Sequence, residues 1–65
     1  MKQISKEQAK ANLEYTQKQI DSFLEFEEEA TRLGYHEELS SILSRLRNYA
    51  SELLEIIELY EIKES

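Results

Sequence analysis

Residues 39–60 read LSSILSRLRNYASELLEIIELY, and this stretch decides the fold. Apolar residues follow one another in it at alternating steps of four and three: Leu39, Leu43, Leu46, Ala50, Leu53, Ile57 and Tyr60. This is the heptad pattern, which places all these side chains along one side of a single helix. A second stripe, Ile42, Tyr49 and Ile56, runs beside the first at steps of seven. The apolar surface is therefore wider than one neighbouring helix covers.

A weaker pattern of the same kind precedes this helix. The heptad positions between residues 5 and 33 hold Ala9, Leu13, Thr16, Ile20, Phe23, Glu27 and Ala30. Ser5 and Gln8 fit a capping box, in which each side chain bonds the backbone N–H of the other residue. For Glu27, an acid at a core position, we expect an edge location with Phe26 filling the space. The alternative is a buried acid paired with an arginine or the histidine.

Gly34, the only glycine, separates the two patterns. Glycine readily adopts the left-handed conformation with which many helices end. We predict a single helical-hairpin domain over residues 1–65, with helices at about 5–33 and 37–62 and a turn at 34–36. Because the turn is short, the two helices must be antiparallel neighbours. The predicted fold class is all-α, an antiparallel two-helix hairpin.

In such a hairpin residue i lies near residue 70 − i, roughly, and the charges agree with this register. Residues 1–18 carry a net charge of +2, whereas residues 34–65 carry −4. The expected ion pairs are Lys6–Glu64, Lys10–Glu61, Lys18–Glu52 and Glu25–Arg45. The expected apolar layers are Ala30 with Leu39, Phe23 with Leu46, Ile20 with Ala50, Leu13 with Ile57, and Ala9 with Tyr60.

The size and composition of the chain limit its function. A chain of 65 residues without cysteine has a small core and no disulfides, so it is marginally stable by itself. The net charge of −6 opposes binding to nucleic acids and anionic membranes. The sequence holds no apolar run typical of a membrane span or a secretory leader. We therefore expect a cytoplasmic protein without membrane contact.

The surplus apolar side chains predict an interface with another polypeptide. The residues expected in it are Phe26, Leu33, Ile42, Tyr49 and Ile56. A second copy of the hairpin would cover them in a homodimer, forming a four-helix bundle with two-fold symmetry. The alternative is a different protein that supplies the missing helices.

The sequence contains no pattern typical of catalysis, a metal site or a cofactor. His36 is the only histidine, no glutamate stands three residues before it, and no cysteine is present. The serines that follow His36 lie at positions expected on the helix surface, without a base and an orienting group around them. We predict a protein that is not an enzyme and has no catalytic residues, metal or cofactor.

The remaining prediction is a protein-interaction module of accessory or regulatory function. Small acidic proteins can bind a partner through a negative surface, and an acid-rich segment supplies one here. The residues expected on this acidic partner face are Asp21, Glu25, Glu28 and Glu29.

The short acidic two-helix layout, together with residues 46–53 (LRNYASEL), resembles the Rop family of plasmid copy-number regulators. The resemblance implies a dimeric four-helix bundle that binds paired RNA loops through its first helix. In this chain the possible RNA contacts are Lys6, Lys10 and Lys18, although the family's basic and aromatic contact residues have no clear match in residues 5–33. The layout is also similar to the small hairpin chaperones of type III secretion needle subunits. These two resemblances provide the alternative functions.

Overall fold

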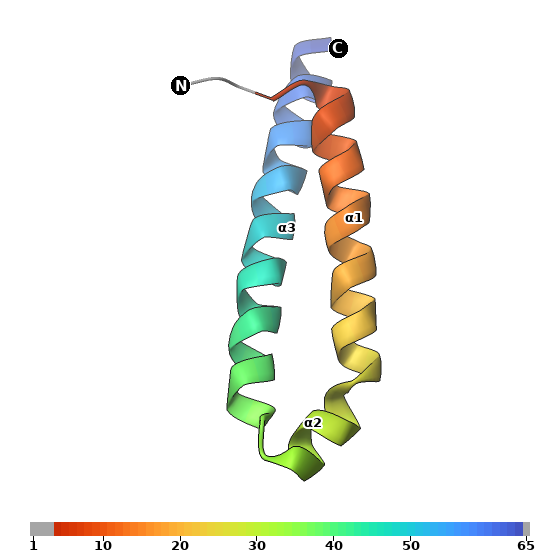
Figure 1. The fold of residues 1–65 in the computed structure, drawn as a ribbon. Helices are drawn as coiled ribbons and strands as arrows, with labels where there is room; N and C mark the ends of the chain where they lie inside the picture. The colour runs from red at the N-terminus through yellow and green to blue at the C-terminus, as the bar shows by residue number, and fades with distance from the viewer. Residues whose placement is uncertain (1–3, 65) are drawn as a thin grey trace.

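The computed structural model describes residues 4–64 and is all-α, as the sequence predicts: 92% of the described residues are helical and none is in a strand. The three helices are α1 (Lys6–Glu25), α2 (Glu27–Leu33) and α3 (His36–Glu64). Helices α1 and α3 run side by side in opposite directions, and α2 joins them at one end (Figure 1). The molecule measures 48 × 19 × 17 Å, so it is a rod with one long contact between helices.

The single helix predicted over residues 5–33 is divided in two at Phe26. The N–H of Phe26 is shared between the carbonyl oxygens of Phe23 at 3.2 Å and Ser22 at 3.3 Å, so the helical bonding is loose here. Three glutamates, residues 27–29, follow in the first turn of α2, where the partial positive charge of a helix N-terminus favours acids. The chain therefore bends at Phe26 and starts a new helix.

The start of α1 and the end of α2 follow the local sequence. The Ser5 side chain accepts a hydrogen bond of 3.1 Å from the N–H of Gln8, which confirms the predicted N-cap. The Gln8 side chain, however, donates forward to Asn12 Oδ1 at 2.7 Å. At the end of α2, Gly34 has a φ of 86°, and its N–H bonds Thr31 O while that of Tyr35 bonds Ala30 O. This pair of bonds is the Schellman motif, which satisfies the last carbonyls of a helix.

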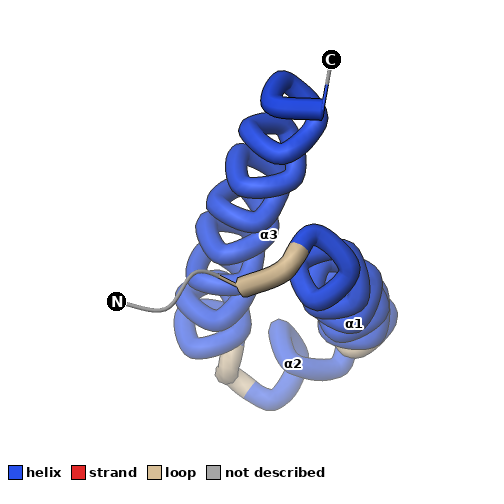
Figure 2. Tube along the Cα trace, turned by 90° about the horizontal axis from the view of Figure 1, so that it is seen from above, coloured by secondary structure: helices blue, strands red, loops and turns tan. Residues whose placement is uncertain are grey.

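Two apolar clusters fill the contact between the helices. One contains Ile20, Ala30, Leu39 and Leu43, with Phe23 and Leu46 packed against it. The other contains Ala9, Leu53 and Ile57, with Ile4, Leu13 and Ile56 packed against it. Ile4, which precedes α1, packs against the second cluster. Figure 2 shows the loop before α1 turning toward α3.

The predicted layers are correct in part. Ala30 shares a cluster with Leu39, Phe23 with Leu46, and Leu13 with Ile57. Ile20, in contrast, clusters with Leu39 and Leu43 rather than with Ala50. Ala9 clusters with Leu53 and Ile57 rather than with Tyr60. These partners lie nearer to the start of α3 than predicted, because the bend at Phe26 changes the register between α1 and α3.

Two polar residues occupy predicted core positions, and they differ in burial. Thr16 is buried, and its hydroxyl donates a hydrogen bond of 2.7 Å to Asn12 O. Glu27 is exposed, which agrees with the expected edge location and not with a buried ion pair. Phe26 is itself 47% exposed, so the expectation that it fills the space beside Glu27 is wrong.

Of the predicted ion pairs, one forms and others do not. Lys6 Nζ lies 2.7 Å from Glu64 Oε2, which confirms this predicted pair. Lys18 Nζ lies 4.0 Å from Glu14 Oε1 on its own helix, so the predicted pair with Glu52 is wrong. Within residues 4–64 no ion pair joins Glu25 to Arg45 either. The pair of Lys10 with Glu61 stays a prediction.

Candidate protein-binding site

The stripe Ile42, Tyr49 and Ile56 runs along one side of α3, each residue standing one position before a core residue. On the first half of the chain the equivalent positions, again one before a heptad position, are Asn12, Gln19 and Phe26. In an antiparallel pair these two stripes adjoin along the same edge of the helix contact. We call these six residues the Tyr49 edge.

The apolar members of the Tyr49 edge are only partly covered by the chain itself. Ile42 is 40% exposed, Tyr49 43% and Phe26 47%. Ile56 is half-buried, because it packs against the cluster of Ala9, Leu53 and Ile57. Of the five residues predicted at an interface, Ile56 is thus the one that the hairpin covers best. Leu33 is 59% exposed, and it lies on α2, apart from the Tyr49 edge.

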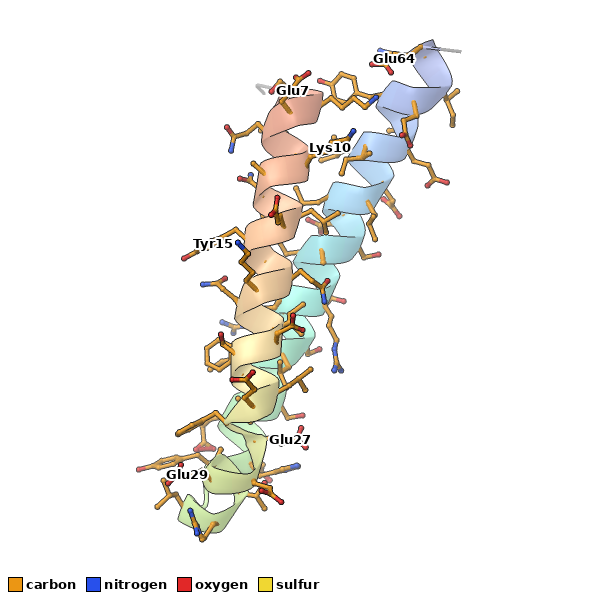
Figure 3. All side chains as sticks on the ribbon, turned by 90° about the vertical axis from the view of Figure 1, so that its right-hand side faces the viewer. Glu7, Lys10, Tyr15, Glu27, Glu29 and Glu64 are labelled. Carbon is orange, nitrogen blue, oxygen red and sulfur yellow. The ribbon has the colours of Figure 1, made fainter. Side chains whose placement is uncertain are left out.

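The polar side chains of the Tyr49 edge, which come from α1, form hydrogen bonds with tyrosine hydroxyls. The Asn12 amide donates to the Tyr49 hydroxyl at 3.3 Å, and Asn12 in turn accepts from Gln8 at 2.7 Å. Gln19 donates to the hydroxyl of Tyr15 at 3.3 Å. Figure 3 shows that Tyr15 and Lys10 leave α1 on opposite sides. The aromatic hydroxyl of Tyr49 is therefore held by α1 while part of its ring stays in solvent.

Asn12 and Gln19, with Tyr15 beside Gln19, are not among the residues that the sequence predicts at this site. A pattern in the sequence could have indicated them, because two stripes of uncharged residues run along α1 at steps of seven. One consists of Gln8, Tyr15 and Ser22, and the other of Asn12, Gln19 and Phe26 at the bend. The charged residues of α1 all lie outside these stripes: Lys6, Glu7, Lys10, Glu14, Lys18, Asp21 and Glu25. Absence of charge, rather than presence of apolar residues, marks this side of α1.

The predicted acidic partner face is divided between two helices. Asp21 and Glu25 lie on α1, whereas Glu28 and Glu29 lie on α2 beyond the bend at Phe26. All four side chains are exposed, and Glu29 lies 3.3 Å from Arg32. The acids surround the bend instead of forming one continuous stripe.

The three lysines considered for RNA binding are in different situations. Lys6 is bound to Glu64, and this hydrogen bond raises the pKa of the lysine above its ordinary value. Lys18 is exposed beside Glu14 on its own helix, and Lys10 is exposed. The structure therefore does not bring the three ammonium groups together as one basic surface.

A metal, a membrane and a catalytic site are the other kinds of site to consider in residues 4–64. No group of three or more His, Cys, Asp or Glu side chains there is placed to hold a metal ion. No helix in this range is long and apolar enough to cross a membrane. A solvent-open groove lies beside the first half of α3, and Glu27, His36, Ser40, Ser44 and Arg47 are among the residues that line it. Among the described residues no hydrogen bond joins Ser40 or Ser44 of this groove to His36 or Glu27.

The chain was also compared with known proteins. No protein-family model, no curated protein and no solved structure matches it. The function must therefore be argued from the geometry of the Tyr49 edge and from the charges around it.

Proposed function

We propose that this protein is a non-enzymatic protein-binding module that works as a homodimer, in which two hairpins form a four-helix bundle. The observation that carries the proposal is the exposure of large apolar side chains along the Tyr49 edge: Phe26, Ile42 and Tyr49 are 40 to 47% exposed. Contiguous exposed apolar surface marks an interaction site. Covering each such side chain fully stabilises a complex by up to about 1.5–3 kcal/mol.

The small core also supports dimerisation. Eight apolar residues are buried among those described, and three of them are alanines: Ala9, Ala30 and Ala50. Alanine contributes little apolar surface, and a chain of this length without disulfides usually needs a further source of burial. A second copy that covers the Tyr49 edge would supply it.

The dimer would leave an acidic surface for a second type of partner. Asp21, Glu25 and Glu28 are exposed around the bend, and the net charge of the chain is −6. Complementary charge speeds association and selects between partners. A basic protein surface is therefore the partner that we propose for the assembled dimer.

The dimer can be tested by light scattering coupled to size exclusion. We expect a mass of twice the 7.7 kDa of the chain. Tyr49→Glu should shift the mass to that of the monomer while circular dichroism still shows a helical protein. The matched control is Leu54→Glu, since Leu54 is exposed on α3 on the other side of the core stripe from the Tyr49 edge. A folded wild-type monomer at high micromolar concentration would contradict the proposal.

The acidic partner surface needs a separate test. Tagged dimer should retain a basic partner from cell extract, and Glu28→Lys combined with Asp21→Lys should release it. The double variant Glu55→Lys/Glu58→Lys changes the same charge on α3 and should retain the partner. Equal binding by both double variants would contradict the proposed surface.

The Rop-like alternative would require Lys6, Lys10 and Lys18 to be available on one surface. Because Lys6 is bound to Glu64 at 2.7 Å, no observation favours this function, and we do not propose it.

A further inference from the structure

We infer that the second copy binds the Tyr49 edge with the two α3 helices antiparallel, related by a two-fold axis that passes beside Tyr49. This inference rests on the proposed homodimer and deepens it by giving the docking geometry. It follows from three features of the chain that surround this one residue.

The first feature is the spacing of the apolar stripe. Ile42 stands seven residues before Tyr49, and Ile56 seven residues after it. In an antiparallel two-fold pair a residue k positions before the axis faces the residue k positions after it on the other copy. Ile42 would therefore face Ile56 of the partner subunit, and Tyr49 would face Tyr49 of the partner subunit. The stripe is complementary to a reversed copy of itself.

The second feature is a pair of opposite charges beside the stripe. Arg45 precedes Tyr49 by four residues and Glu52 follows it by three, so both adjoin Tyr49 on the helix surface. Both side chains are exposed, and in the described part of the chain neither forms an ion pair. The intramolecular partners that the simple hairpin register would give them, Glu25 and Lys18, are displaced by the bend at Phe26.

The same antiparallel pairing would use these two charges. Arg45 stands four positions before the axis and Glu52 three positions after it, so Arg45 would lie one residue away from directly opposite Glu52 of the partner subunit, within reach of the two long side chains. The two-fold axis would repeat the contact. The interface would then have an apolar centre at Tyr49 and two ion pairs beside it. Charges arranged in this way fix the register and orientation of an interface more than they add affinity.

The third feature is the lack of charge on the part of α1 that adjoins Tyr49. Asn12 bonds the Tyr49 hydroxyl, and the stripes of α1 on this side hold only uncharged residues. A second copy that packs against Tyr49 would therefore not bury a charged side chain of α1. Interface centres are depleted in charged residues and enriched in tyrosine, as this one is with Tyr15 and Tyr49.

A second copy fits these features better than an unrelated protein does. An unrelated partner would need apolar residues and charges, but it would not require them to be symmetric about one position of this chain. The symmetric spacing of Ile42, Tyr49 and Ile56, with Arg45 and Glu52 beside it, matches a partner that carries the same pattern.

Charge reversal on the full chain tests the geometry. Arg45→Glu would place acids against acids across the axis, and Glu52→Arg would place bases against bases. Each single variant should raise the dimer dissociation constant about tenfold or more in sedimentation equilibrium at low salt. The double variant R45E/E52R should restore the wild-type constant. A mixture of the two single variants should form a heterodimer tighter than either homodimer, because that mixture restores opposite charges at every contact.

The matched controls are Arg47→Glu and Glu55→Arg, which change the same charges on other sides of α3 and should leave the dissociation constant unchanged. Single-variant constants equal to that of the wild type, or a double variant that stays weak, would overturn the docking geometry while the homodimer stands. A wild-type monomer at millimolar concentration would overturn both proposals. Circular dichroism of each variant confirms that the exposed substitutions leave the helices intact.

Discussion

The phenolic hydroxyl of Tyr60 donates a hydrogen bond of 2.6 Å to the backbone carbonyl oxygen of Ile4. Ile4 precedes the N-cap residue Ser5 and packs against the cluster that contains Ala9 and Leu53. The contact therefore joins the start of the described chain to the last turns of α3. It fixes the entry of the chain into α1 at the end of the rod that lies opposite α2.

Tyr60→Phe should weaken this closure without changing the packing of the ring. The variant loses one partly buried hydrogen bond, so we expect the free energy of unfolding to fall by about 0.5–1.5 kcal/mol. Urea unfolding followed by circular dichroism measures this change. Tyr15→Phe is the control, because Tyr15 is 65% exposed and should lose almost nothing. Equal effects of the two substitutions would show that the Tyr60 bond does not stabilise the fold.

Gly34→Ala should destabilise the chain through the backbone alone. Gly34 has a φ of 86°, and a Cβ added to it would meet no atom within 4 Å. The left-handed conformation costs a residue with a Cβ roughly 1–2 kcal/mol, so we expect a loss of that size in thermal or urea unfolding. Gly34→Asn should lose less, since asparagine tolerates this conformation better. A neutral Gly34→Ala variant would contradict the observed turn geometry.

Thr16→Val should leave the stability unchanged or raise it by up to about 1 kcal/mol. The Thr16 hydroxyl bonds Asn12 O, a carbonyl that also accepts the regular helical bond four residues on, so its removal leaves no unpaired group. The added methyl group is buried, because Thr16 is 2% exposed. Thr16→Ala, which removes the hydroxyl and the methyl, should be destabilising. A large loss in Thr16→Val would show that the hydroxyl has a structural role beyond this one bond.

The features that the sequence predicts well are local ones. The caps at Ser5 and Gly34 and the long heptad of α3 depend on residues within a few positions of each other. The sequence does not predict the bend at Phe26, because no proline or glycine stands there, and these are the residues that usually break a helix. Because the predicted helix has no bend, the predicted partners of Ile20, Ala9 and Lys18 differ from the observed ones.

The sequence predicts only the apolar residues of the candidate site, for a related reason. Hydrophobic periodicity identifies Ile42 and Tyr49 because they are apolar side chains at steps of seven. Asn12 and Gln19 are polar, and their part in the site depends on hydrogen bonds to tyrosine hydroxyls. The bond from Asn12 to Tyr49 requires the spatial register of α1 against α3, which the heptad of α1 leaves open because Ala9 and Thr16 are small. The bond from Gln19 to Tyr15 lies within α1.

The contribution of the ion pair between Lys6 and Glu64 should disappear at high pH. The hydrogen bond to Glu64 raises the pKa of Lys6 above its ordinary value of 10.5, so the folded state holds this proton more tightly than the unfolded state. The stabilisation is complete below the unfolded-state pKa and is lost as the pH rises through the higher folded-state pKa.

Unfolding of the wild type and of Lys6→Met, measured from neutral pH to above pH 10.5, tests this dependence. The wild type should be the more stable at neutral pH, and the difference should shrink at the alkaline end. In a Glu64→Gln background, the difference in unfolding free energy between Lys6 and Lys6→Met should be smaller at neutral pH. It should also change less as the pH rises. A difference between wild type and Lys6→Met that grows with pH would contradict the sign of the shift.

Cysteine crosslinking should distinguish antiparallel from parallel docking of the two α3 helices. The chain contains no cysteine, so each introduced thiol is the only one on its copy. With the axis beside Tyr49, an Ile42→Cys copy should form a disulfide with an Ile56→Cys copy, because the two positions face each other across the interface. Neither variant should crosslink efficiently with itself, since its two thiols would lie several turns apart, beyond the reach of a disulfide.

Differently tagged copies allow the mixed and self-linked products to be separated after mild oxidation. Tyr49→Cys is the positive control, because residues on the axis face themselves, and Asn48→Cys is the negative control on the outer side of α3. Efficient self-linking of Ile42→Cys would indicate parallel helices. In that arrangement Arg45 would face Arg45 of the partner subunit, so the charge pattern beside Tyr49 would oppose docking instead of directing it.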